Sequence, residues 1–110
     1  MATITFDDFK RVEMRVGKIL EAEEFPAAKK PSYRLRIDFG KYGIKKSSAQ
    51  ITHKYTKEAL AGKLVLAVTN FPPKQIADFV SEVLVLGIVT KDGVVLLSVD
   101  EPVELGSLVE

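Results

Sequence analysis

The stretch NFPPKQIADFVSEVLVLG, residues 70–87, decides the fold that we predict for this chain. It opens with an amide and an aromatic residue, passes two prolines and a lysine, and runs into an apolar segment at residues 83–89. Because proline has no N–H to donate and restricts its neighbour, Pro72-Pro73 cannot lie inside a sheet. We therefore predict that residues 71–80 connect two buried strands across the surface, where ligand-contacting groups often lie.

The residues before this stretch show strand patterns and one short helix. We expect four strands, at residues 14–25, 33–39, 44–51 and 64–69. A helix at residues 56–60, capped by Thr56, separates the last two strands. Gly17 interrupts the pattern of the first strand, which indicates a bulge or a strong bend there. Tyr33 shares the apolar face of the second strand, so we expect it in the core.

The two ends of the chain add shorter elements. Thr5 and Asp8 are spaced as the cap and first turn of a short helix. Residues 83–90 and 94–99 are expected as strands joined by a turn at Lys91-Asp92-Gly93. The whole pattern predicts an all-β fold in a single domain, residues 1–110. This fold is a small barrel with one short helix between its third and fourth strands and extensions at both ends.

The charge of the chain is distributed unevenly, although its net value is only +1. Residues 26–75 contain eleven basic and two acidic residues, a net charge of +9, so the remainder carries −8. A basic middle indicates an anionic partner for that region. The alternative is a solvated charge pattern that folding interleaves, because segregation along the sequence does not guarantee segregation in space.

The sequence offers no constellation for catalysis, a metal or a cofactor. There is no cysteine, and His53, the only histidine, has no orienting acid or nucleophile near it in sequence. No glycine-rich phosphate loop follows a strand. The N-terminus lacks a signal-like apolar segment, and the apolar runs are too short to span a bilayer. We expect a non-catalytic cytoplasmic protein that does not insert into membranes.

Three segments carry a resemblance to a known family: KKSSAQIT at residues 45–52, NFPPKQIA at residues 70–77 and SEVLVLG at residues 81–87. They resemble the tRNA-binding-domain family, which includes free-standing tRNA-binding proteins and C-terminal domains of some methionyl-tRNA synthetases. The CsaA branch is the most similar, and the resemblance covers nearly the whole chain. It implies an oligonucleotide-binding (OB) barrel with its ligand face around the second and third strands. Many members have methionine where this chain has Leu84.

The ligand implied by the resemblance is tRNA or similarly folded RNA, bound by cations on phosphates and aromatic rings on bases. Asn70, Ser81 and Leu84 match the tRNA-contacting motif of the family. The side chains of Asn70 and Ser81 are equally suited to forming hydrogen bonds with backbone groups that the Pro-Pro turn leaves unpaired. The predicted RNA-binding residues are Arg34, Arg36, Lys45, Lys46, Lys54, Asn70, Phe71, Lys74, Ser81 and Leu84.

The resemblance also implies a homodimer, with residues 1–12 and 100–110 building the interface. CsaA-like proteins are thought to hold unfolded export precursors, so a groove between subunits could accept extended peptides. The apolar residues available for this seam are Phe6, Phe9, Val80, Leu105, Leu108 and Val109. They could equally bury one another in the dimer. A further alternative is a module that lends RNA affinity to a partner enzyme.

Overall fold

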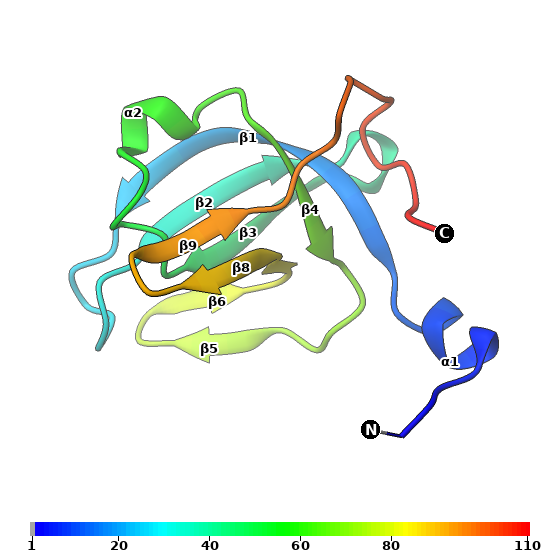
Figure 1. Cartoon of the computed structure of the whole chain (residues 1–110). Helices are drawn as coiled ribbons and strands as arrows, with labels where there is room; N and C mark the ends of the chain where they lie inside the picture. The colour runs from blue at the N-terminus through cyan, green and yellow to red at the C-terminus, as the bar shows by residue number, and fades with distance from the viewer. Residues whose placement is uncertain (1) are drawn as a thin grey trace.

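The computed structural model describes residues 2–110 and shows a nearly closed, strand-rich barrel (Figure 1). Five antiparallel strands form the main sheet in the order β3-β2-β1-β4-β7. They are β1 (Met14–Glu24), β2 (Tyr33–Asp38), β3 (Ile44–Ala49), β4 (Leu64–Val68) and β7 (Leu84–Val85). Two hairpins add β5 (Lys74–Ile76) with β6 (Phe79–Ser81), and β8 (Gly87–Thr90) with β9 (Gly93–Leu96).

The helices of the described residues are short. They are α1 (Phe6–Lys10) and α2 (Lys57–Leu60), with a 3₁₀ turn, η1, at Gly40–Tyr42. Helix α2 lies between β3 and β4 and is capped by the Thr56 hydroxyl, which accepts from the Ala59 N–H at 3.2 Å. The predicted OB barrel with one helix between its third and fourth strands is therefore confirmed. Within residues 2–110, no helix is both long and apolar enough to cross a membrane.

The core follows from strict alternation along β2. Tyr33, Leu35 and Ile37 are buried, while Arg34 and Arg36 face outward. Burial of Tyr33, as predicted, leaves its hydroxyl satisfied, because it donates to the Tyr55 carbonyl at 2.8 Å. The core cluster comprises Ile19, Tyr33, Leu35, Ile37, Phe39, Ile51, Leu60, Val65, Ala67 and Val83.

The first half of strand β1 pairs with β4, and its second half pairs with β2. The bulge in β1 lies between Ile19 and Glu21, so a bulge predicted at Gly17 is wrong in position. Gly17 instead marks a close approach in the core. A Cβ placed there would lie 2.5 Å from Cγ2 of Ile37 and 2.6 Å from Cε1 of Phe39. Lys18 pairs with both Leu64 of β4 and Asp38 of β2, so the bulge follows directly after the residue at which β1 changes neighbours.

The barrel closes where β3 meets residues 81–83. The Glu82 N–H donates to the Lys46 carbonyl at 2.8 Å, and the Glu82 carboxylate accepts from the Lys46 N–H at 3.0 Å. One step along, the Ser81 hydroxyl accepts from the Ser48 N–H at 3.0 Å. Side chains thus replace part of a regular ladder at this seam, which satisfies backbone groups that the sheet leaves open.

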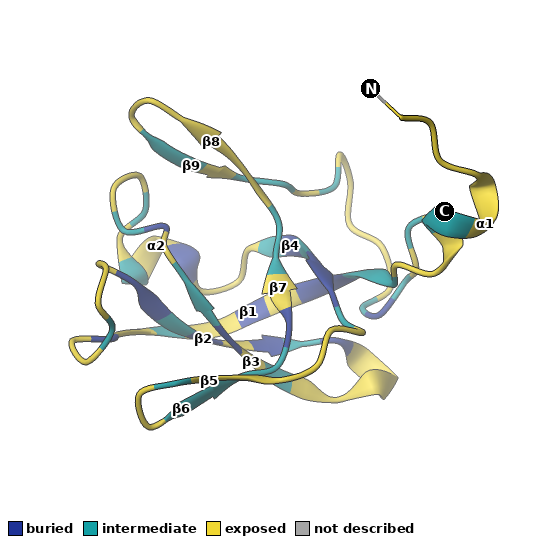
Figure 2. Cartoon of the chain, turned by 90° about the horizontal axis from the view of Figure 1, so that it is seen from below, coloured by how far each residue is buried: buried dark blue, intermediate teal, exposed yellow. Residues whose placement is uncertain are grey.

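The chain on either side of this seam differs from the sequence prediction. The connection predicted at residues 71–80 contains most of the β5–β6 hairpin, which ends at Ser81. The prediction of a single buried strand at residues 83–90 is wrong. Val83 is buried and β7 pairs with β4. The chain then leaves the barrel, and β8 is exposed along its length (Figure 2). An apolar run alone does not distinguish a buried strand from an exposed one. The predicted turn before Gly93 is confirmed, whereas β9 ends at Leu96.

Both ends of the chain lie on one side of the barrel (Figure 1). Helix α1 projects outward and starts with a reciprocal cap, in which the Thr5 hydroxyl and the Asp8 carboxylate each accept the other's N–H at 3.1 Å. This confirms the predicted helix start. The C-terminal segment follows β1, because the Gly106 N–H donates to Val16 and the Val109 N–H to Met14, both at 2.8 Å.

Candidate nucleic-acid interface

A groove beside the β5–β6 hairpin brings together four of the predicted RNA-binding residues. We call it the proline groove; it has a volume of about 340 Å³. Its lining residues are Phe71, Pro72, Lys74, Ser81, Glu82, Val83 and Leu84. Phe71 is 53% exposed and Leu84 is 48% exposed, so the walls present apolar surface to a ligand. This surface beside the Lys74 ammonium can hold a base or an apolar side chain together with an anionic group.

Ser81 lines the proline groove, but its hydroxyl already has backbone partners. It accepts from the Ser48 N–H at 3.0 Å and donates to the Val83 carbonyl at 3.5 Å. These contacts hold the end of β6 against β3. The structure therefore gives Ser81 the backbone-satisfying role that was the alternative to a ligand contact, although the groups satisfied belong to the barrel seam.

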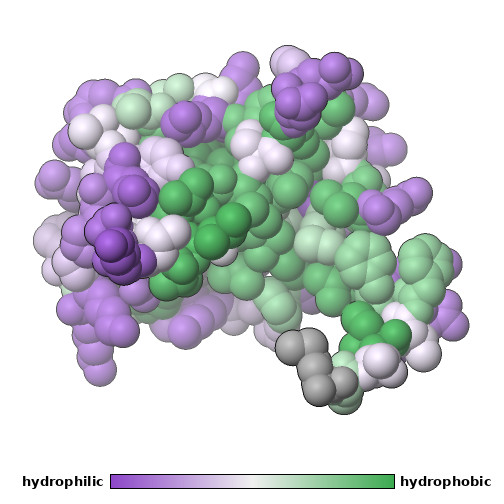
Figure 3. Space-filling view, in the orientation of Figure 1, coloured by the Kyte–Doolittle hydropathy of each residue, from purple (hydrophilic) through white to green (hydrophobic). Residues whose placement is uncertain are grey.

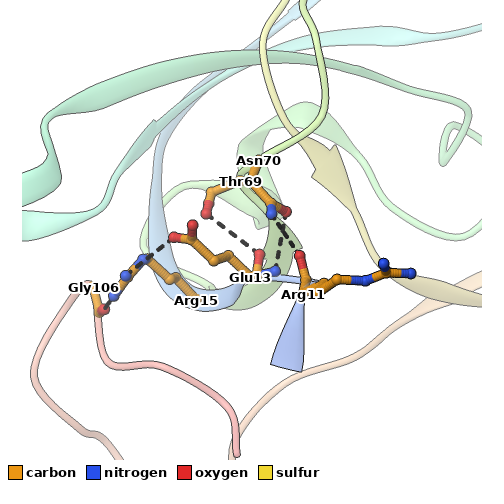
Figure 4. A network of polar contacts seen from close by, with 6 residues as sticks. All are labelled: Arg11, Glu13, Arg15, Thr69, Asn70 and Gly106. Carbon is orange, nitrogen blue, oxygen red and sulfur yellow. Dashed lines mark hydrogen bonds and ion pairs between the residues drawn. The ribbon is translucent and has the colours of Figure 1, made fainter. Parts of the chain in front are cut away.

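The Asn70 side chain points toward the chain just before β1 (Figure 4). Its amide oxygen accepts from the Glu13 N–H at 3.0 Å, and its amide nitrogen donates to the Arg11 carbonyl at 2.7 Å. Thr69 adds bonds from its N–H and its hydroxyl to the Glu13 carbonyl, at 2.8 and 3.3 Å. Asn70 thus anchors the end of β4 to the start of β1 and does not line the proline groove.

The outer face of β2 carries both predicted arginines, but each is paired with a glutamate of β1. Arg34 lies 3.1 Å from the Glu23 carboxylate, and Arg36 lies 3.0 Å from Glu21. Solvent-exposed pairs of this kind contribute little stability, and an incoming phosphate can replace the carboxylate as acceptor. The pairs do reduce the positive potential of this face in the free protein.

Lys46 belongs to the same outer face and is part of a row of cations and aromatic rings. It sits opposite Arg36 in the β2–β3 ladder, and its Nζ lies 5.3 Å from the ring centroid of Phe79. Phe79 meets Phe25 edge-on at 5.4 Å, and Cζ of Arg34 lies 5.5 Å from the Phe25 centroid. This row packs the β5–β6 hairpin against the barrel. The two phenylalanines were missed by sequence analysis because they meet only in the folded chain.

Lys45 and Lys54 lie apart from that face. Lys45 pairs with the buried Ile37, so it points to the inner side of β3, opposite to Lys46. Strict alternation along a strand could have separated these two lysines before the structure was known. The Lys54 side chain runs past the tip of the β8–β9 hairpin, where its Cγ lies 3.2 Å from a Cβ placed on Gly93. The predicted residues therefore occupy several surfaces.

Comparison with known proteins identifies the family and the fold of the chain. The family described as "Putative tRNA binding domain" matches residues 14–108. The crystal structure of the chaperone CsaA from Bacillus anthracis is 46% identical with a TM-score of 0.93, and covers 99% of this chain and 100% of that one. The CsaA chaperone from Picrophilus torridus is 52% identical with a TM-score of 0.93, and covers 98% and 100%.

A curated relative is much longer than this chain. The methionine–tRNA ligase of Thermotoga maritima is 37% identical over 106 residues, which are 96% of this chain but 16% of the ligase. The chain therefore spans about a sixth of that relative's length. Since the family match extends over most of the barrel and the C-terminal segment, the chain belongs to the tRNA-binding-domain family.

Proposed function

We propose that this protein is a non-catalytic, cytoplasmic tRNA-binding protein of the CsaA type. It binds tRNA or a similarly folded RNA through the proline groove and the outer face of β2 and β3. The observation that carries the proposal is the convergence of Phe71, Lys74 and Leu84 on one groove. Phe71 and Leu84 supply apolar surface for an unstacked base, and Lys74 supplies a cation for its phosphate.

The outer face extends the contact along the RNA backbone. Lys46 has no carboxylate within ion-pairing distance among residues 2–110, so its charge is available to a phosphate. Arg34 and Arg36 join it when phosphate oxygens replace the carboxylates of Glu23 and Glu21. In this arrangement the groove holds a base while the face of the sheet follows the backbone.

The test is tRNA affinity measured across a salt series, for wild type, Lys46→Gln and Lys74→Gln. Each lost phosphate contact should weaken binding and lower the slope of log affinity against log salt by about one. Lys91→Gln, an exposed lysine in the β8–β9 turn, is the matched control and should leave the slope unchanged. An equal loss of tRNA affinity in all three variants would contradict a site localised at Lys46 and Lys74.

Phe71→Ala separates base contact from backbone contact. Loss of one base–aromatic contact should lower tRNA affinity by about 1–3 kcal/mol, and the salt slope should stay as in wild type. An unchanged affinity would remove the proline groove from the proposal. The proposal as a whole would fail if wild-type protein bound tRNA no better than it binds an unrelated polyanion.

A second candidate function is a peptide-binding chaperone for secretory precursors, acting as a homodimer. The observation that favours it is a band of apolar surface that runs from the β8–β9 hairpin toward α1 (Figure 3). Val89 of β8 is 84% exposed, and Phe6, Phe9, Val12 and Leu108 line a further cavity of about 240 Å³ between α1 and the chain end. The test is to titrate an unfolded, near-neutral peptide into the protein over the same salt series as tRNA. The affinity for the peptide should not change with salt, because apolar contacts are not screened.

A further inference from the structure

A second pocket lies where η1 meets the start of β1, apart from the proline groove. We propose that it binds one unpaired nucleotide, with the base against Tyr42 and the phosphate at Lys41 and Lys45. The pocket has a volume of about 210 Å³ and is lined by Glu13, Arg15, Phe39, Tyr42, Lys45 and Thr69. It shares no lining residue with the proline groove.

Tyr42 is held between neighbours and is 42% exposed. The Arg15 guanidinium covers one face of its ring, with Cζ 3.8 Å from the centroid, so a base would stack on the other face. The C-terminal segment supports the ring, because a Cβ placed on Gly106 would lie 2.8 Å from Cδ2 of Tyr42. A ring fixed in this way contributes stacking area without a large loss of side-chain freedom.

The charge available to a ligand comes from Lys45, which lines the pocket, and from Lys41, which lies beside Tyr42. Arg15 is committed to the fold, because its guanidinium donates to the Gly106 carbonyl at 2.8 Å and to the Glu13 carboxylate at 3.2 Å (Figure 4). Lys41 and Lys45 have no carboxylate within ion-pairing distance among residues 2–110. Lys41 Nζ lies 5.4 Å from the Tyr42 centroid, so a cation stands beside the stacking surface. This pairing of ring and ammonium suits a base and its phosphate.

Glu13 gives the pocket a preference among bases. Its Oε1 accepts from Arg15, while no hydrogen bond to its Oε2 is formed within residues 2–110. A carboxylate oxygen accepts from the N–H groups on a base edge. Guanine presents its N1–H and its amino group side by side on a large ring system, whereas uracil presents a single N3–H between two carbonyl oxygens, which a carboxylate repels. The pocket should therefore bind a guanine nucleotide more tightly than a uracil nucleotide.

Nucleotide titration monitored by NMR of ¹⁵N-labelled protein tests the proposal, with GMP, UMP and inorganic phosphate as probes. GMP should shift the amide signals of Tyr42, Gly43 and Thr69, UMP should bind more weakly, and phosphate should shift mainly Lys41 and Lys45. Tyr42→Leu should weaken GMP binding at least about fivefold, because the stacking surface is lost. Tyr42→Phe should retain binding, and Lys45→Gln should weaken both GMP and phosphate, with Lys91→Gln as the matched control.

Three outcomes would overturn the proposal. The first is that GMP shifts only signals of the proline groove and that Phe71→Ala abolishes these shifts. That result would rule out the second pocket but would not contradict the proposed binding of tRNA through the proline groove. The second is identical shifts with phosphate and GMP, which would reduce the pocket to an anion site. The third is GMP binding that Tyr42→Leu and Lys45→Gln both leave unchanged.

Discussion

Ser47 shows how one side chain contributes to closing the barrel. It is fully buried, and its hydroxyl donates to the Val83 carbonyl at 3.0 Å across the seam between β3 and the chain before β7. A buried polar group without a partner costs about 1–3 kcal/mol, and the Ser47 hydroxyl is the nearer of two donors to the Val83 carbonyl, Ser81 being the other at 3.5 Å. The serines and glutamate of the KKSSAQIT and SEVLVLG segments therefore specify the seam, whatever else they contact.

A comparison of Gly106 with Gly62 distinguishes two costs of placing a side chain on a glycine: backbone strain and steric overlap. Both have φ near +90°, but a Cβ on Gly106 would lie 2.5 Å from the Phe39 carbonyl oxygen, whereas nothing lies within 4 Å of one on Gly62. Gly62→Ala should lower the free energy of unfolding by about 1–2 kcal/mol through strain alone. Gly106→Ala should cost clearly more, because the steric contact is with backbone.

Urea denaturation of both variants checks this difference. Equal losses would mean that the C-terminal segment moves away from η1 without penalty. That result would also remove the support that we assign to the Tyr42 ring.

The turn of the β5–β6 hairpin places a non-glycine residue in the left-handed backbone region. Ala77 has φ of +53°, the only positive φ among non-glycine residues in the described part of the chain. The side chain of Gln75 supports the turn by donating to the Ala77 carbonyl at 2.7 Å. The hairpin keeps this conformation because Phe79 and Ser81 tie β6 to the barrel.

Ala77→Gly should stabilise the protein by about 0.5 kcal/mol, because relief of left-handed strain slightly exceeds the entropy cost of glycine. The matched control is Ala61→Gly, whose φ of −60° carries no such strain and which should destabilise slightly. Thermal and urea unfolding measure both variants. A loss of stability in Ala77→Gly as large as in Ala61→Gly would show that the turn is not strained.

At the scale of the whole molecule, folding interleaves charges that the sequence keeps apart. The acidic β1 lies beside the basic β2, so Glu21 and Glu23 pair with Arg36 and Arg34. The alternative of an interleaved charge pattern is therefore realised on this face. All four salt bridges among residues 2–110 are made by arginines, so the lysines keep their charge free of such partners; Lys74 lines the proline groove and Lys45 lines the second pocket.

The proposed homodimer should depend on α1 and the chain end, which present Phe6 and Leu108 to solvent. Phe6→Glu and Leu108→Glu should each shift the protein toward a monomer, because a charge would be buried in an apolar seam. Ile44→Glu, at an exposed apolar position on β3, is the matched control and should remain dimeric. Sedimentation velocity measures the change. A wild-type monomer would contradict the homodimer, and three unaffected dimers would place the seam elsewhere.

The sequence by itself determined the elements whose signals are local. Alternation along β2, the reciprocal cap at Thr5 and Asp8, the cap of α2 at Thr56 and the turn before Gly93 are each set by residues a few positions apart. Such patterns fix local conformation before any tertiary contact exists. Together with the family motifs they were enough to predict the barrel and its single intervening helix.

Only the tertiary structure decided where the functional side chains point and what they contact. Asn70 forms hydrogen bonds with Glu13 and Arg11, which are 57 and 59 residues away in the sequence. Arg15, Tyr42 and Gly106 come from three separate segments of the chain, and Arg15 contacts the other two. The site of the bulge, the exposure of β8 and the pairing of Arg34 and Arg36 likewise depend on which strands become neighbours. Those contacts are long-range, and strand register, which sets them, is a property of the closed barrel.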